Sequence, residues 1–321
     1  MTNGIFYNMF RNGDLFLTRE FAKSMMKQVP EFQWFYAHGN HPDSLKDLPS
    51  AYLPMPHHWE VCMSNKCVSH ETSELLPSKK PLHEYEIVRH FSDKSPMYIN
   101  TWAGCFYNVH FKPTTYPNMN EFRAIWNDIG ARVSNIVNRK IHFSDDIVNY
   151  FPTIDESQFN ANVVNEFYKN LRSAGYKNCV LFANGKSMSG QSQLASMDNA
   201  IIGLSRKFRK TAMIVTSHID TTQSNIFFTQ NVFNKEFDLP EISLLSSFCN
   251  IIVGKNSGPF TYAHTKKNVL DRNKTFISFS NLSRDNLLHE VPSLCNFMHS
   301  STADEGEVEL ILHDIIKQKY E

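Results

Sequence analysis

The sequence predicts an α/β protein in which two doubly wound, Rossmann-like domains face each other across a cleft. The chain has 321 residues, which is more than one hydrophobic core usually serves. Short apolar runs also alternate along it with segments of helical periodicity, an order typical of parallel sheets with helices on their faces. We therefore expect one domain at residues 1–150 and a second at residues 151–321.

The N-terminal half is expected to hold strands, helices and a long irregular segment. Its strands are predicted at 4–10, 33–37 and 98–106, and its helices at 15–30 and 118–138. Residues 40–96 are rich in Pro, His and Ser without a sustained period, which indicates irregular structure with one or two short strands. The polar segment 144–160 is the expected connection between the domains.

The C-terminal half repeats the alternation of strand and helix. Its strands are predicted at 179–183, 211–216, 226–229, 250–253 and 275–279, the last of these being the final strand. Its helices are predicted at 161–173, 199–208, 240–248 and 258–268, followed by a terminal helix that begins with the acidic residues 304–309. The sequence predicts a second parallel sheet covered by helices.

Composition and charge limit the class of protein. Hydrophobic residues make up 41% and charged residues 20%, as in ordinary globular proteins, and the formal net charge is zero. A nucleic-acid binder normally carries a basic excess, so no nucleic acid is expected as partner. The six scattered cysteines fit reduced thiols, and neither a signal peptide nor a membrane-spanning run of ~18 apolar residues is recognisable. We expect a soluble, cytoplasmic protein.

Polar residues follow the first two predicted strands. In open α/β sheets, ligands bind beyond the carboxyl ends of the strands. Asp14, after Asn12 and Gly13, either caps the following helix by accepting amide bonds from its next turn or acts as a general base. Asn12 and Gly13, which lets the backbone turn tightly, are candidates for binding an acceptor. His38, Asn40 and His41 are candidates too, with plain loop structure as the equal alternative for these three.

The turn Asn256-Ser257-Gly258-Pro259 lies between a buried strand and a predicted helix. Amide groups at a helix N-terminus can bind a diphosphate, and Pro259 fits an early helical position. A plain corner between strand and helix is the alternative.

Lys186 and Ser187 lie in a small polar loop directly after the strand at 179–183. One lysine in such a loop could hold nucleotide phosphates, although the spacing of a P-loop is absent. A solvated loop is the alternative. Glu241, at the start of its helix, could either cap that helix or face a bound ribose.

Other catalytic motifs are missing from the sequence. His57, His58, Cys62, Cys67 and His70 are metal-ligand types, but their spacing fits no closed zinc site, so no metal is expected. Neither G-x-S-x-G nor G-x-G-x-x-G occurs, and no D-x-D follows an apolar strand. These observations favour chemistry without a metal ion or a cofactor.

The segments RNGDLFLTREFAKSM and LPEISLLSSFCNIIVGKNSGPFTYAHTKKN together resemble the heptosyltransferase-like (GT9-type) branch of the GT-B glycosyltransferases. In that branch a strand-G-D-helix opening carries the catalytic Asp, and a strand followed by a [ST]-G-x turn holds the donor diphosphate. The resemblance implies Asp14 as the base and Ser257, Gly258 and Pro259 as the donor turn.

The resemblance extends to two further residues and stops there. Lys186 matches the lysine after the first donor-domain strand, and Glu241 lies where the family often has an acid. Residues 40–110 match no known segment, and the histidine that the family has soon after its [ST]-G turn is replaced here by Phe260 and Thr261, with His264 later.

The resemblance implies a metal-independent, inverting transfer of a hexose or pentose from a nucleotide-sugar donor to a glycan or another hydroxyl acceptor. Two other classes of function stay open. One is a catalytically silent module that binds a sugar nucleotide or glycan, because a fold does not define a function. The other is a nucleotide-sugar epimerase or hydrolase, which would consume the donor without an acceptor.

Overall fold

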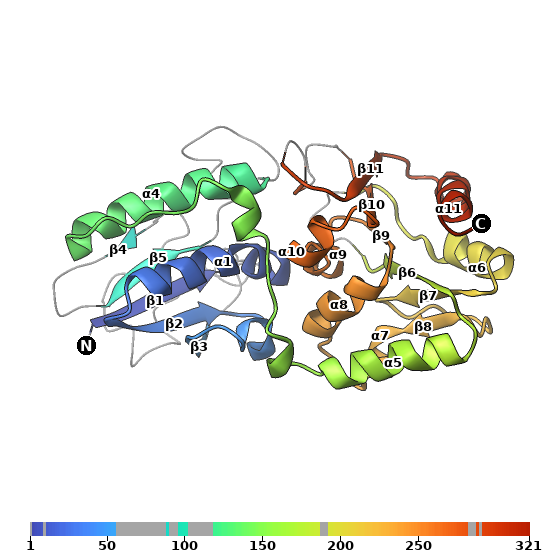
Figure 1. The fold of residues 1–321 in the computed structure, drawn as a ribbon, viewed down its shortest axis with the longest axis horizontal. Helices are drawn as coiled ribbons and strands as arrows, with labels where there is room; N and C mark the ends of the chain where they lie inside the picture. Colours follow the sequence, from blue (N-terminus) through green and yellow to red (C-terminus); the bar gives the residue numbers. More distant parts are fainter. Residues whose placement is uncertain are drawn as a thin grey trace. The chain divides into compact units, whose positions relative to one another are not determined.

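The computed structural model describes residues 2–8, 11–55, 88–89, 96–101, 118–186, 192–281, 287–288 and 291–321. The chain divides into two compact units, Met1–Pro152 and Thr153–Glu321, each with its own sheet and helices (Figure 1). The mixed α/β class with two mainly parallel sheets is confirmed. None of the helices in the described part of the chain is long and apolar enough to span a bilayer.

The described residues of the first unit form a five-stranded sheet in the order β3-β2-β1-β5-β4. Its strands are β1 (Thr2–Asn8), β2 (Phe32–His38), β3 (Ala51–Pro54), β4 (Val88–Arg89) and β5 (Met97–Asn100). Strand β1 runs parallel to β2 and β5, while β4 is antiparallel to β5. Asn8 and His38 pair in the register, so both mark the carboxyl edge of this sheet.

Helices α1 (Asn12–Gln28) and α4 (Met119–Val137) lie side by side in the first unit (Figure 1). Aromatic rings fill the space between them and the sheet. Phe6 of β1 stacks on Trp34 at a centroid distance of 4.6 Å, and Phe21 of α1 stacks on Trp126 of α4 at 5.4 Å. Alternation along the strands sends Ile5 and its neighbours to the opposite face, which has a smaller core of its own.

The described residues of the second unit form a six-stranded sheet in the order β11-β10-β9-β6-β7-β8, in which every pair is parallel. Its strands are β6 (Asn178–Ala183), β7 (Thr211–Val215), β8 (Ile226–Phe228), β9 (Ile251–Gly254), β10 (Thr275–Phe279) and β11 (Asn296–Ser300). Such a sheet must be covered on both faces, which is why its inner strands are uninterrupted apolar runs.

The helices of the second unit are α5 (Ala161–Ser173), α6 (Asp198–Lys207), α7 (Thr229–Phe233), α8 (Leu239–Leu245), α9 (Gly258–Tyr262), α10 (Lys266–Val269) and α11 (Glu305–Tyr320). Helices α6 and α11 pack side by side on one face (Figure 1) and bury Val180, Met213 and Ile277 of the sheet beneath them. Short 3-10 helices lie at Pro42–Leu45, Ile147–Tyr150, Glu156–Gln158 and Ser246–Phe248.

The structure corrects three predicted elements. The helix expected at 258–268 is split into α9 and α10, because the Thr265 hydroxyl accepts the N–H of Asn268 and begins a new helix. The strand at 275–279 is not the last, since β11 follows it and pairs with β10. Thr229, expected in a strand, begins α7. One or two short strands were expected within 40–96, and β3 and β4 lie there.

Candidate functional site

Asp14 lies in the first turn of α1, just beyond the carboxyl end of β1. Arg11, not Asp14, is the N-cap residue, and Asp14 is the third residue of the helix. Its carboxylate accepts the backbone N–H of Arg11 at 3.2 Å. The predicted cap is therefore corrected, because Asp14 reaches back to satisfy an amide before the helix rather than one in the following turn. Its side chain is half-buried.

The other predicted residues of this edge divide by burial. Gly13, His38 and Asn40 are buried, Asn12 is half-buried, and His41 is exposed. The Ser44 hydroxyl donates to Asn12 Oδ1 at 2.8 Å. The His41 ring accepts the Asp43 N–H at 3.2 Å and so caps a 3-10 helix. Asn12 and His41 thus have structural contacts at the edge where the sequence predicts an acceptor site.

A buried chain of hydroxyl groups connects this edge to α1. The Tyr36 hydroxyl lies 2.6 Å from Thr101 Oγ1 and 3.1 Å from Thr18 Oγ1. Thr18 is also 3.2 Å from the carbonyl oxygen of Asp14, and Asn8 donates to Thr101 at 3.3 Å. Burial raises the pKa of Tyr36 to about 12, so its hydroxyl stays protonated. This row of hydrogen-bonded hydroxyl groups fixes the first turn of α1 relative to β1, β2 and the end of β5.

The predicted donor turn follows β9 directly. Ser257 is the N-cap of α9, and Asn256 before it has a left-handed φ of 28°. Ser257 Oγ is buried and has no hydrogen-bond partner among the described residues. Gly254 is required by packing, since a Cβ there would come within 2.5 Å of the Phe260 ring. A Cβ on Gly258 would meet only Leu239, at 3.9 Å.

Lys255, in the same turn, is buried to 1% exposure. Its Nζ donates to the carbonyl oxygens of Ala195 at 3.1 Å and Leu194 at 3.4 Å. Burial lowers the pKa of this ammonium, while Asp198 acts in the opposite direction. The lysine therefore connects the donor turn to the segment before α6, a role that the sequence analysis missed.

Lys186 follows the strand next to β9. Ala183 of β6 pairs with Gly254 of β9, so the Lys186 loop and the donor turn leave neighbouring strand ends. Lys186 is exposed, and Ser187 lies outside the described residues. At the base of the loop, the Asn184 side chain donates to Asp198 at 3.1 Å and also bonds the backbone at the end of β7.

Glu241 is the third residue of α8, and its side chain is fully buried. Its Oε1 pairs with Lys235 Nζ at 2.9 Å, whereas Oε2 has no hydrogen-bond partner in the described part of the chain. Leu239, at the start of α8, contacts the Gly258 position, which puts the first turns of α8 and α9 together. Of the two predicted alternatives, capping does not occur, because the carboxylate is paired with a lysine.

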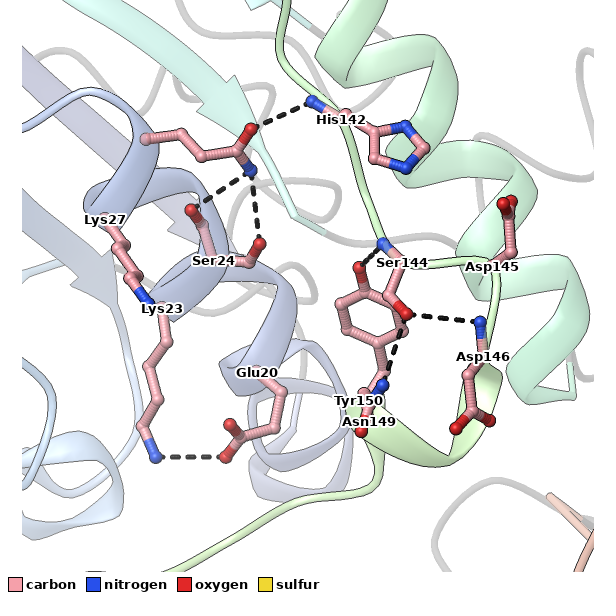
Figure 2. Close-up of a pocket in the computed structure, with 11 residues that line it drawn as sticks. Glu20, Lys23, Ser24, Lys27, His142, Ser144, Asp145, Asp146, Asn149 and Tyr150 are labelled. Atoms are coloured by element: carbon pink, nitrogen blue, oxygen red, sulfur yellow. Dashed lines mark hydrogen bonds and ion pairs between the residues drawn. The ribbon is translucent and has the colours of Figure 1, made fainter.

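A groove of about 920 Å³ lies elsewhere in the first unit, between α1 and residues 142–150 (Figure 2). Its polar groups bond one another: Gln28 Oε1 accepts the His142 N–H at 2.9 Å, and Lys23 pairs with Glu20 at 3.0 Å. The Tyr150 hydroxyl accepts the Ser144 N–H. No residue predicted from the sequence lines this groove, and its contacts hold segment 142–150 against α1.

The cysteine and histidine cluster considered as a metal site lies outside the described residues. This applies to His57, His58, Cys62, Cys67 and His70, and also to Cys105. Cys179, Cys249 and Cys295 are buried free thiols. Burial raises the pKa of Cys179 to about 11, which makes it a poor nucleophile.

Two successive units, each with a mainly parallel sheet and polar residues at its carboxyl edge, have the architecture of the GT-B fold. No protein-family model and no curated protein matches the chain, whereas several solved structures match it in fold. Escherichia coli ADP-heptose lps heptosyltransferase II is 11% identical with a TM-score of 0.55, and the match covers 100% of both chains.

Two further structures match over nearly the whole chain. A glycosyl transferase of family 9 from Veillonella parvula DSM 2008 is 11% identical with a TM-score of 0.52, covering 97% of this chain and 91% of that one. The complex of S. aureus MnaA with UDP is 11% identical with a TM-score of 0.52, covering 99% and 90%. The chain therefore resembles the GT9 heptosyltransferases in fold, as the sequence analysis expected.

Proposed function

We propose that the chain is a glycosyltransferase that moves a sugar from a nucleotide-sugar donor to a hydroxyl acceptor, without a metal ion and with inversion at the anomeric carbon. The observation that carries this proposal is the carboxylate of Glu241. It is fully buried in the first turn of α8, whose first residue Leu239 contacts the Gly258 position, yet Oε2 has no partner among the described residues. A buried unpaired acceptor costs about 1–3 kcal/mol, so a ligand hydroxyl is its natural partner.

The second unit is the proposed donor side. The buried hydroxyl of Ser257 and the amide of Gly258 would hold the diphosphate, and the exposed ammonium of Lys186 would neutralise part of its charge. Glu241 would accept a hydroxyl of the nucleoside ribose. Asn256, Pro259 and Ser187 complete the set of proposed donor-binding residues.

The first unit is the proposed acceptor side, where Asp14 would act as the general base. Its carboxylate would take the proton of the acceptor hydroxyl as that oxygen attacks the anomeric carbon and the nucleoside diphosphate leaves. A single displacement of this kind inverts the configuration of the sugar. Gly13, His38 and Asn40 lie at the same sheet edge and are the proposed acceptor contacts, together with Asn12 and His41.

Thermal unfolding in the presence of nucleotides tests the donor side. The panel is ADP, UDP and their sugar derivatives, because the similar structures include an ADP-heptose heptosyltransferase and a complex with UDP. A ligand that binds only the native state adds about 2.7 kcal/mol at a hundredfold excess over its Kd. We expect one nucleotide family to raise the Tm, and Lys186→Ala and Ser257→Trp to abolish the rise.

The same screen separates the alternatives. A shift with one nucleotide and turnover with an acceptor support a transferase. Binding without turnover for any acceptor indicates a silent binding module, and consumption of the donor alone indicates an epimerase or hydrolase. No shift with any nucleotide, while a control enzyme responds to its own ligand, would contradict the proposed function.

A further inference from the structure

We propose that Lys235 is a positioning residue for Glu241: it holds that buried carboxylate turned so that Oε2 accepts a hydroxyl of the bound donor. This inference rests on the proposed function and adds to it a residue that the sequence pattern did not single out. It starts from one asymmetry, since Oε1 is 2.9 Å from the ammonium of Lys235 while Oε2 has no partner among the described residues.

The backbone around Lys235 is fixed on both sides. Helix α7 ends at Asn234, whose left-handed φ of 50° turns the chain, and the Lys235 N–H then donates to the carbonyl oxygen of Gln230 at 3.3 Å. The Gln230 side chain in turn donates to the carbonyl oxygen of Glu236 at 2.8 Å. The lysine therefore reaches Glu241 from a constrained turn, as a positioning residue must.

Burial explains why Glu241 needs this partner. The Glu241 side chain is 0% exposed and that of Lys235 is 22% exposed, so the carboxylate cannot rely on water to stabilise its charge. Lys235 is the partner that holds Oε1, so without its ammonium the carboxylate can turn away from a ligand. With it, the carboxylate keeps one orientation and presents Oε2 as the acceptor for a ligand hydroxyl.

A second carboxylate makes the single lysine more important. Asp238, the N-cap of α8, is buried, and burial raises its pKa, with the charge of Glu241 acting in the same direction and Lys235 against it. These are the charged groups shown to act on the pair in the described part of the chain. Two acids thus share one ammonium, and its removal takes away the counter-charge that the described residues show for both.

Stability tests the ion pair without any ligand. We expect Lys235→Met to lower the Tm, because it leaves the buried carboxylate of Glu241 without its ammonium. The double variant Lys235→Met/Glu241→Gln should recover most of the loss, and an Asp238→Asn background separates the two acids. Lys207→Met is the matched control, since Lys207 pairs with Glu309 on the surface at 2.7 Å.

Nucleotide affinity tests the positioning. With ADP or UDP as the probe, calorimetry should show Lys235→Met binding at least tenfold more weakly than the wild type. Lys235→Arg should stay within about threefold of the wild type. In a Glu241→Gln background, Lys235→Met should have no further effect on nucleotide affinity, because the proposal has the lysine influence the ligand through Glu241.

The outcomes distinguish the two proposals. If the wild type binds neither nucleotide, the proposed function is wrong and this role of Lys235 falls with it. If the wild type binds but Lys235→Met binds equally well, the function stands and the inference is wrong. A further loss in the Glu241→Gln background would show that Lys235 contacts the ligand itself, which also overturns it. Should Lys235→Met not fold, the double variant and Lys235→Arg still decide the question.

Discussion

The carboxylate of Asp14 accepts the backbone N–H of Arg11 at 3.2 Å, so the side chain proposed as the base also stabilises the start of α1. An Asn side chain can accept the same N–H through its amide oxygen, but it cannot take a proton from an alcohol. The substitution Asp14→Asn therefore separates the structural role of Asp14 from its proposed catalytic role.

Asp14→Asn is expected to lower kcat by roughly 10²–10⁴-fold, the usual contribution of a general base. Nucleotide affinity and Tm should change little, because the donor residues belong to the other unit and the bond to Arg11 is kept. Product formation, calorimetry and thermal unfolding measure the three quantities. Asp146→Asn is the matched control: Asp146 accepts the Val148 N–H at 3.1 Å and caps a 3-10 helix, so its variant should stay fully active.

Asp14→Ala adds the structural loss. Removing the acceptor for the Arg11 amide should cost about 1 kcal/mol of stability, as for other residues that satisfy amides at a helix N-terminus. Turnover by Asp14→Asn at the rate of the wild type would show that another group takes the proton. A large fall in Tm for Asp14→Asn would instead mean that the residue is needed mainly for folding.

Gly254 and Gly258 flank the donor turn, and their surroundings differ, so a methyl group should have a different effect at each position. A Cβ on Gly258 meets only Leu239, at 3.9 Å, whereas one on Gly254 meets Phe260 at 2.5 Å. Gly258→Ala should keep the Tm of the wild type within about two degrees and yet weaken nucleotide binding, since the methyl group obstructs a diphosphate approaching the amides. Gly254→Ala should lower the Tm, because the Phe260 ring must move.

Thermal unfolding with and without ADP or UDP measures both effects in one experiment. Unchanged nucleotide affinity in Gly258→Ala would remove this position from the proposed donor site. A stable Gly254→Ala variant would show that the turn can adjust its backbone to accept the methyl group.

The strands were predictable from the sequence where they are buried on both faces. The apolar run at 179–183 corresponds to β6 and the run at 275–279 to β10, because inner strands of a parallel sheet contain little else. Strand β11 was missed for the opposite reason. Its sequence, NFMHS, is largely polar and Met298 is 43% exposed, so no apolar pattern marks this edge strand.

The partners of the polar site residues were not predictable, because their spacing carries no regular signal. Tyr36 and Thr101 are far apart in the sequence and meet only after β2, β1 and β5 have paired. Lys255 bonds a carbonyl near residue 195, and no local pattern names that acceptor. The positions of candidate residues thus follow from strand ends, whereas their charge states follow from tertiary packing.

His264 makes the protein sensitive to mild acid. Its ring is fully buried, Nδ1 lies 2.8 Å from the carbonyl oxygen of Phe260, and burial lowers the pKa of the imidazole from 6.5 to about 4. The unfolded chain therefore binds a proton between pH 6.5 and 4 that the folded chain does not. Stability present above pH 6.5 is lost as the pH falls toward 4, by about 3 kcal/mol for this group.

Replacement of His264 by Phe removes the titrating group and keeps an aromatic ring against Phe276, on which the imidazole stacks at 4.5 Å. As the pH falls from 7 to 4.5, we expect the wild type to lose more unfolding free energy than the variant does. Urea unfolding at several pH values measures it. His313→Phe, a half-exposed histidine beside Asp314, is the control and should not reproduce the effect. Parallel pH profiles for wild type and His264→Phe would contradict the assignment.

Lys274 is expected to be a structural residue on which the second unit depends. Its ammonium is buried and donates to the carbonyl oxygens of Ser246 at 2.8 Å, Ser247 at 2.7 Å and Cys249 at 2.7 Å. These carbonyls close the 3-10 helix before β9, so Lys274→Met leaves several buried acceptors unsatisfied and should cost roughly 3 kcal/mol. Lys207 pairs with Glu309 on the surface, so Lys207→Met should lower the free energy of unfolding by only about 0–1 kcal/mol. Chemical denaturation compares the two variants, and equal losses would mean that water replaces the ammonium at the Lys274 site.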